Sequence, residues 1–220
     1  MRFLILFIPC IIFYLYPDID LKVSSLFYSD GFYLKDTLFA RFIYRATMVA
    51  VALFAVSTLF LLSVELITKR EWVKKSVLIY LLLVLAIGPG LIVNEILKNH
   101  FGRARPSHIV EFGGDKKFTP AMVVTNQCEK NCSFSSGHAA AAFYFIALSF
   151  VAKTKRVKRV LFWLAILWGS LVGFVRIIQG GHFLSDVYCS FFVVYLTSYL
   201  LYKIYLKGKD ETISSDTGNE

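Results

Sequence analysis

Residues 160–206, VLFWLAILWGSLVGFV-RIIQGGHFLSD-VYCSFFVVYLTSYLLYKIYL, decide the fold, because a short polar run separates two long apolar ones. The flanking runs, 160–175 and 187–206, consist mostly of hydrophobic side chains. A helix needs about 20 such residues to cross the ~30 Å hydrocarbon core of a bilayer. The stretch therefore predicts two membrane helices joined at one membrane face by the polar turn 176–186.

The composition places the whole chain in the same class. Of its 220 residues 57% are hydrophobic and only 18% are charged, and the mean hydropathy is +0.62. A soluble domain of this length carries more charge. Two more long apolar runs (46–66 and 76–97) and two shorter ones (3–16 and 139–152) bring the expected membrane helices to six. We expect an all-α polytopic membrane protein, a six-transmembrane-helix bundle.

The two ends of the chain carry separate expectations. Run 3–16 could be the apolar part of a signal peptide, but the bulky Tyr14-Leu15-Tyr16-Pro17 offers no small-residue cleavage site. A retained first helix is therefore favoured. Residues 210–220 are polar and acidic, so we expect a disordered tail after a single membrane domain at 1–209.

The basic residues indicate a topology. The formal net charge is +9, and basic clusters lie at 69–75, 153–159 and 203–209. Because positive residues favour cytoplasmic loops, we expect both termini on the cytoplasmic side of the membrane and the other loops outside. These outer segments are 17–45, 98–136 and 176–186. Nucleic-acid binding is not indicated, since it would need a soluble basic face.

The four cysteines fit this layout. Cys10 and Cys189 fall in or beside apolar runs and are expected to pack as small hydrophobic residues. Cys128 and Cys132 lie in an expected outer segment, where an oxidising compartment favours a disulfide. Zinc is the alternative, although one pair without a second pair is a weak metal-binding pattern.

The turn at 176–186 holds an arginine, a histidine and an aspartate. His182 and Asp186 are four residues apart, so on a helix they would lie on one face. A carboxylate at that distance can fix one ring nitrogen and leave the other free to attack or to take a proton. Arg176 supplies a permanent cation for an anionic substrate. The alternative is an ion cluster that only caps two membrane helices.

A second polar cluster follows the apolar run 76–97. Lys98 and Arg105 are seven residues apart and would face one point if the helix continued that far. Arg103, between them, is interpreted as an anchor in the lipid headgroup region. The pair predicts a site for an oxyanion once other groups join it.

A third cluster, Ser136-Gly137-His138, precedes the alanine run of the next apolar segment. Serine is a candidate N-cap there, and the free backbone N–H groups of a helix start favour an anion. Gly137 would allow a close approach of the backbone to that anion. A lone histidine at a helix start is usually a capping residue, but a second histidine and three cations at the same face favour a function for His138.

The three clusters together resemble the type 2 phosphatidic acid phosphatase superfamily. The motifs occur in order and with full spacing, and they cover the chain from the expected third helix to the sixth. They are Lys98 with Arg105-Pro106, Ser136-Gly137-His138, and Arg176 with His182 and Asp186. Ser135 stands where the family often has proline, and Val175 where it often has serine. Neither departure removes a charged group.

Other stretches are similar to one branch of that superfamily, the bacterial lipid A phosphatases that act on the 4′-phosphate. These stretches are 87–94, 112–116, 127–134 and 179–183. The resemblance implies a membrane lipid phosphatase that hydrolyses a phosphomonoester of lipid A, or of a membrane phospholipid, on the periplasmic face of a bacterial inner membrane. It also implies a metal-independent reaction without a cofactor. It implies no obligate protein partner.

The family resemblance also implies a role for each motif residue. His182 would be the nucleophile that forms a phosphohistidine, with Asp186 orienting its ring. His138 would be the general acid and base. The remaining motif residues would bind the phosphate: Lys98, Arg105, Ser136, Gly137 and Arg176.

Several alternatives remain open from the sequence. The same residues would serve an undecaprenyl diphosphate or phosphatidylglycerophosphate phosphatase, or a phosphotransferase between lipids. A transporter or a non-catalytic scaffold is the alternative outside enzymes. Transporters place polar groups near the bilayer midplane, whereas here the polar clusters fall at the outer helix ends.

Overall fold

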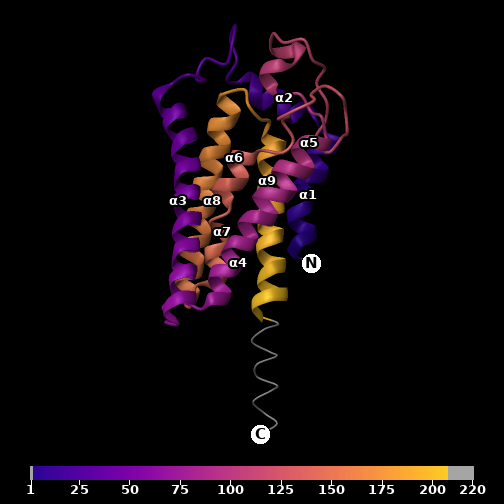
Figure 1. The fold of residues 1–220 in the computed structure, drawn as a ribbon. Coiled ribbons are helices and arrows are strands. Elements are labelled where there is room, and N and C mark those ends of the chain that lie inside the picture. The colour runs from indigo at the N-terminus through magenta and orange to yellow at the C-terminus, as the bar shows by residue number, and fades with distance from the viewer. Residues whose placement is uncertain (1, 208–220) are drawn as a thin grey trace.

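The computed structural model describes residues 2–207, so the expected tail at 210–220 lies outside the described residues. Within the described part every regular element is a helix, and the long helices form a bundle (Figure 1). The all-α prediction is confirmed. In chain order the elements are α1 (Arg2–Leu15), α2 (Asp18–Ser25), α3 (Leu38–Thr68), α4 (Lys75–Leu85), the π-helix η1 (Ala86–Leu97), α5 (Lys98–His100), the 3₁₀ helices η2 (Pro106–His108) and η3 (Val110–Phe112), α6 (Gly137–Phe143), α7 (Ile146–Val151), α8 (Lys155–Ile178), α9 (Leu184–Leu201) and the π-helix η4 (Tyr202–Lys207).

Four helical stretches of residues 2–207 are long and apolar enough to cross a membrane. They are Leu38–Thr68, Lys75–His100, Lys155–Ile178 and Leu184–Lys207. A fifth span results if α1 and α2 are counted together, although they are bent by 83° at their junction. The sixth expected segment is a shorter apolar helical stretch, Gly137–Val151. The prediction of six helices is thus roughly consistent with the bundle.

The shorter stretch, α6 and α7, forms the centre of the bundle. It packs against α3, α8 and α9, and Ala139, Ala140 and Ala142 are fully buried. Small residues allow this close packing: a Cβ on Gly169 of α8 would lie 2.1 Å from the Phe143 ring. Surrounded by other helices, α6 and α7 need not reach across the whole bilayer.

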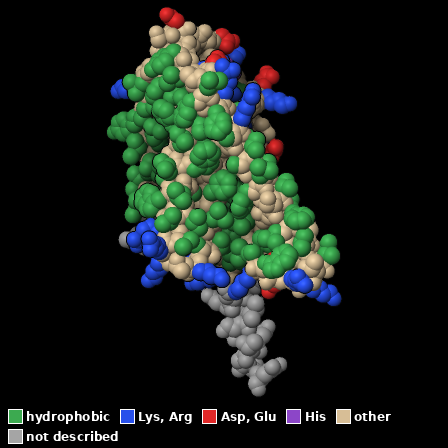
Figure 2. Space-filling view, turned by 90° about the vertical axis from the view of Figure 1, so that its left-hand side faces the viewer, with side chains coloured by type: hydrophobic (Ala, Val, Ile, Leu, Met, Phe, Trp, Pro, Cys, Tyr) green, Lys and Arg blue, Asp and Glu red, His purple; other side chains and the backbone are tan. Residues whose placement is uncertain are grey.

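The outer surface of the bundle is apolar over its middle. Figure 2 shows hydrophobic side chains covering this part of one face, with lysine and arginine gathered toward both ends. Leu53, Phe60 and Leu167 are more than half exposed there. In water such a surface would be a large exposed apolar patch. The molecule is a multi-pass membrane protein whose exposed apolar side chains contact lipid.

One end of the bundle carries the connections that build the site. Segments 101–136 and 179–183 lie there, beside α2 and the start of α3 (Figure 1). At the opposite end lie the basic loops 69–74 and 153–156. The predicted separation of the polar motifs from the basic loops is therefore present in the fold.

Candidate active site

The three motifs meet at one end of the bundle. Their charges interact: those of Lys98, Arg105 and Arg176 reach His138, and those of Lys98 and Arg176 reach His182. Each motif comes from a different part of the fold, at a helix end or in a connection between helices. The fold thus brings together every residue that the sequence predicted for the site.

His182 is held in the connection between α8 and α9 and is 1% exposed. Its Nδ1 lies 2.7 Å from the Ser133 carbonyl oxygen and 3.7 Å from Asp186 Oδ2. A carbonyl oxygen only accepts hydrogen bonds, so Nδ1 carries the proton and Nε2 keeps its lone pair. The Nδ1–H group therefore donates to the Ser133 carbonyl oxygen, which the sequence did not indicate. Asp186 lies farther from Nδ1.

The environment of His182 keeps its ring neutral. Burial lowers the pKa of His182 from 6.5 to about 4, and the charges of Arg176 and Lys98 act in the same direction against the opposing effect of Asp186. At neutral pH the imidazole is uncharged and Nε2 is available as a nucleophile.

Asp186, in the first turn of α9, accepts hydrogen bonds at both oxygens. Oδ2 accepts from Ser133 Oγ at 2.5 Å and from the Phe183 N–H at 2.8 Å, so the carboxylate also caps the helix. Oδ1 accepts from Arg103 Nη1 at 2.6 Å. Ser133 thereby contacts both His182 and Asp186, and its hydroxyl and carbonyl fix the two groups relative to each other.

The interpretation of Arg103 as a headgroup anchor is wrong. Arg103 is 1% exposed, and its guanidinium joins Asp186 to Asp20, which lies 2.8 Å from Nη2. Nε donates to the Thr119 carbonyl at 2.9 Å, and Nη1 also donates to Ser185 Oγ at 2.8 Å. Its position in an expected outer loop suggested a contact with lipid headgroups. The structure instead buries Arg103 between two carboxylates, where it supports the site.

Asp20 belongs to a segment, 17–45, that the sequence analysis placed at the outer surface without a role in the site. Its carboxylate is fully buried and accepts from the Ser185 N–H at 2.9 Å as well as from Arg103. The bend of 83° between α1 and α2 places α2 against α9. Asp20 is one of four aspartates in this segment, so nothing in the sequence distinguished it from the others.

Lys98 and Arg105 do not share a helix, because the helix does not continue as far as Arg105. Helix α5 ends at His100, and Gly102 turns the chain with a φ of 63°. A Cβ on Gly102 would lie 1.8 Å from the Thr125 carbonyl oxygen, so the turn requires glycine. Arg105 returns toward the site through this turn rather than along a helix face.

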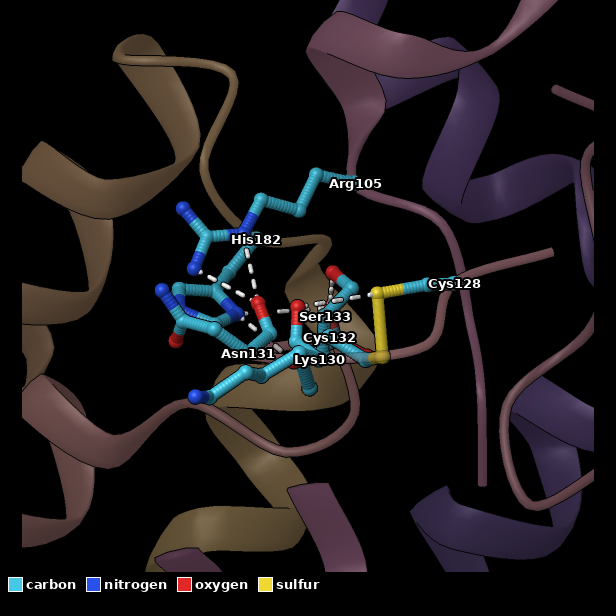
Figure 3. Close-up of a disulfide and its surroundings, with 8 residues drawn as sticks. Arg105, Cys128, Lys130, Asn131, Cys132, Ser133 and His182 are labelled. Carbon is cyan, nitrogen blue, oxygen red and sulfur yellow. Dashed lines mark hydrogen bonds and ion pairs between the residues drawn. A yellow bond between two sulfur atoms is a disulfide. The ribbon is translucent and has the colours of Figure 1, made fainter. Parts of the chain in front are cut away.

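Arg105 is anchored by the loop that Cys128 and Cys132 close with a disulfide (Figure 3). Its Nε and Nη2 donate to the Asn131 carbonyl oxygen at 3.1 and 2.8 Å. Figure 3 shows Arg105 and His182 around this loop, where they bind carbonyl oxygens two residues apart, those of Asn131 and Ser133. The loop therefore holds one cation of the site in place.

The N-terminus of the buried helix α6 points into the same region. Ser136 is its N-cap and its Oγ accepts from the Ala139 N–H at 3.4 Å, as expected. A Cβ on Gly137 would lie 2.4 Å from Asn94 Oδ1, so glycine allows α6 to pack against η1. The helix start offers free N–H groups to an anion.

Tyr44, which sequence reasoning missed, organises the other side of the site. Its ring stacks on His138 with centroids 4.0 Å apart, and the Arg176 guanidinium lies 5.0 Å from the ring centroid. Arg176 Nη1 also donates to Gln179 Oε1. These contacts set the positions of one histidine and one cation of the motifs.

Three buried polar atoms at the site have no hydrogen-bond partner among the described residues. They are His138 Nε2, Arg176 Nε and Ser135 Oγ. Leaving such atoms unpaired is costly, and unpaired groups in active sites commonly bind a ligand. Ser135 stands where the family often has proline. Its hydroxyl has no partner among the described residues, and it precedes the motif serine, Ser136.

A neutral histidine with a free Nε2, a second histidine and three cations define a site that can transfer a phosphoryl group through the imidazole. Its place at the helix ends of a membrane bundle defines the class as a membrane phosphatase. The chain belongs to the PAP2 superfamily, whose family model matches residues 77–210. It is a membrane lipid phosphatase of that superfamily.

Relatives and a solved structure agree with this assignment. The chain is 35% identical over 215 residues to a lipid A 4′-phosphatase of Francisella tularensis subsp. novicida, covering 93% of this chain and 94% of that protein. It is 45% identical over 104 residues to a lipid A 4′-phosphatase of Rhizobium etli, covering 47% and 40% of the two chains. A PAP2-type phosphatidylglycerolphosphate phosphatase from Bacillus subtilis has a similar fold, with a TM-score of 0.62, 20% identity and 96% coverage of both chains.

Proposed function

We propose that the enzyme hydrolyses the 4′-phosphate of lipid A on the periplasmic face of a bacterial inner membrane. Similarity to a lipid A 4′-phosphatase along 93% of the chain is the observation that carries the choice of substrate. The similarity to the phosphatidylglycerolphosphate phosphatase, at 20% identity, concerns the fold. The proposal therefore favours lipid A over a glycerophospholipid.

In the proposed first step, His182 Nε2 attacks the phosphorus and the bond from phosphorus to the sugar oxygen breaks. His138 gives its proton to that oxygen, so that the dephosphorylated lipid leaves as an alcohol. Lys98, Arg105 and Arg176 offset the charge on the phosphoryl oxygens, together with the start of α6. His182 becomes a phosphorylated imidazolium, whose charge is stabilised by Asp186 and by the Ser133 carbonyl.

In the second step, a water molecule attacks the phosphohistidine. His138, now neutral, takes a proton from that water, and the bond between phosphorus and Nε2 breaks to release inorganic phosphate. His182 returns to its neutral form with the proton still on Nδ1. His138 Nε2, buried and without a partner in residues 2–207, suits both proton transfers.

The orientation rests on the separation of charge along the bundle. Basic residues of the loops 69–74 and 153–156 lie at the end opposite to the motifs, and such residues favour the cytoplasm. We therefore place the active site in the periplasm. The disulfide between Cys128 and Cys132 agrees with an oxidising compartment.

The test measures lipids in cells and phosphate release in solution. Mass spectrometry should find lipid A that lacks one phosphate in cells that express the protein. Glycerophospholipids and polyprenyl phosphates should be unchanged. A change confined to phosphatidylglycerophosphate or undecaprenyl diphosphate would refute the choice of substrate.

The phosphohistidine step has its own test. The purified His182→Ala variant should release no phosphate above background, whereas Arg156→Gln, an exposed change at the opposite end of α8, should match the wild type. Substantial activity in His182→Ala would refute the assignment of the nucleophile.

A further inference from the structure

A polar cavity of about 400 Å³ opens beside the motif residues. Arg105 and Arg176 line it together with three further cations. We call these three residues, Lys35, Arg41 and Arg45, the entrance cations. Asp36 is the one carboxylate in the lining, so the cavity is strongly positive.

The entrance cations are unneutralised in the fold. None of the three is in an ion pair among the residues that the structure describes. Arg41 donates from Nε and Nη2 to the backbone carbonyl of Asp36, at 2.9 and 2.6 Å, rather than to its carboxylate. This contact fixes the guanidinium without removing its charge.

Gln179 connects two segments that line the cavity. Its Oε1 accepts from Arg176, and its Nε2 donates to the Lys35 carbonyl oxygen at 3.5 Å. The segment that carries the entrance cations is thus joined directly to a residue of the phosphate site. The entrance cations line the same cavity as Arg105 and Arg176, two cations of the phosphate site.

The reaction itself does not require them. A phosphomonoester presents three terminal oxygens, and Lys98, Arg105, Arg176 and the start of α6 already provide for these. The cavity is also larger than a single phosphate and lies within the range of about 300–1,000 Å³ that is typical of small-molecule sites. Two arginines and a lysine at its mouth are suited to bind another anionic group.

We propose that the entrance cations bind a second anionic group of the same substrate, so that the enzyme selects lipid headgroups that carry two. This inference rests on the proposed function, because lipid A is a disaccharide with a phosphate at each end. The phosphate that is not hydrolysed would contact Arg41 and Arg45 while the other one meets His182. The chemistry recognised is a phosphate or a similar oxyanion.

The test compares two substrates in a neutral detergent. Bisphosphorylated lipid A and its analogue that keeps only the 4′-phosphate are assayed with the wild type and with Arg45→Gln. The wild type should have the lower KM for the bisphosphorylated lipid. Arg45→Gln should raise that KM roughly 10-fold to 100-fold, the loss of one or two charge-assisted hydrogen bonds, and leave the KM for the analogue and both kcat values unchanged.

Two matched variants accompany this assay. Arg41→Gln should act like Arg45→Gln. Both arginines are exposed, but Arg41 also holds the Asp36 carbonyl oxygen, so Arg45→Gln keeps the test valid if Arg41→Gln does not fold. Arg156→Gln also removes one positive charge, but at the end of the bundle opposite to the site. It should leave both KM values unchanged.

Equal effects of Arg45→Gln on the two substrates, or no preference of the wild type between them, would overturn the inference while lipid A cleavage still supported the proposed function. An effect that appears only when phosphatidylglycerol is added would also overturn it, because the cations would then bind neighbouring lipids. Absence of phosphate release from either form of lipid A would overturn the proposed function and this inference with it.

Discussion

Replacing Arg103 with methionine should destabilise the protein strongly. Arg103 lies between the carboxylates of Asp20 and Asp186, at 2.8 and 2.6 Å, and both carboxylates are fully buried. Methionine is of similar length but leaves two buried carboxyl groups without the cation that lies between them.

The magnitude follows from the burial of the cluster. Removing one partner of a buried ion pair costs about 3–5 kcal/mol of folding free energy, because the remaining charge is uncompensated. In a chain of this size each kcal/mol corresponds to about 2–4 °C, so the unfolding midpoint should fall by roughly 6–20 °C. The exposed control Arg156→Met should stay within about 2 °C of the wild type.

A double-mutant cycle separates charge from packing. Asp20→Asn removes one of the two carboxylates, so the Asp20→Asn/Arg103→Met protein should be more stable than Arg103→Met alone. Unfolding in detergent is followed by circular dichroism, with phosphate release measured on the same preparations. An Arg103→Met protein that melts like the wild type, or a double variant no more stable than the single one, would refute the reasoning.

Three further predictions concern the site itself. Burial lowers the pKa of His182 to about 4, so its neutral form predominates above that pH, and the acid limb of kcat/KM should lie near pH 4; an acid limb near pH 6.5 would contradict this. Replacing Cys128 and Cys132 with serine should raise KM by roughly 3-fold to 10-fold, because the loop that holds Arg105 loosens, and a reductant should affect only the wild type; an unchanged KM would exclude this role. Tyr44→Leu should lower kcat roughly 10-fold through loss of the ring contacts with His138 and Arg176, whereas Tyr44→Phe keeps them; equal losses in both variants would assign the effect to the hydroxyl.

The sequence predicted the reacting groups better than it predicted their supports. His182, His138 and the three motif cations could be recognised because phosphoryl transfer needs those residue types in a characteristic spacing. Their supports are a carbonyl oxygen at Ser133, a ring at Tyr44 and a buried carboxylate at Asp20. Almost any residue can present a carbonyl, and aromatic rings are common in a membrane protein, so neither stands out in a list of residues.

The interpretation of Arg103 as an anchor shows the same limit for charge. An arginine in an outer loop of a membrane protein has a plausible place among headgroups, and no feature of the sequence around Arg103 indicates that it is buried. Only the approach of α2 and α9 surrounds Arg103 with carboxylates, whereas Arg105 binds the Asn131 carbonyl oxygen.

By itself the sequence determined the class of fold, because apolar runs of membrane length can only satisfy their backbone as helices in lipid. It also predicted which side chains would perform the chemistry. The tertiary structure alone decided that the Ser133 carbonyl fixes the tautomer of His182, that Arg103 and Asp20 support Asp186, and that α3 adds cations to the cavity. These features join segments that are far apart in the chain, so they arise only when packing brings those segments together and excludes water from between them.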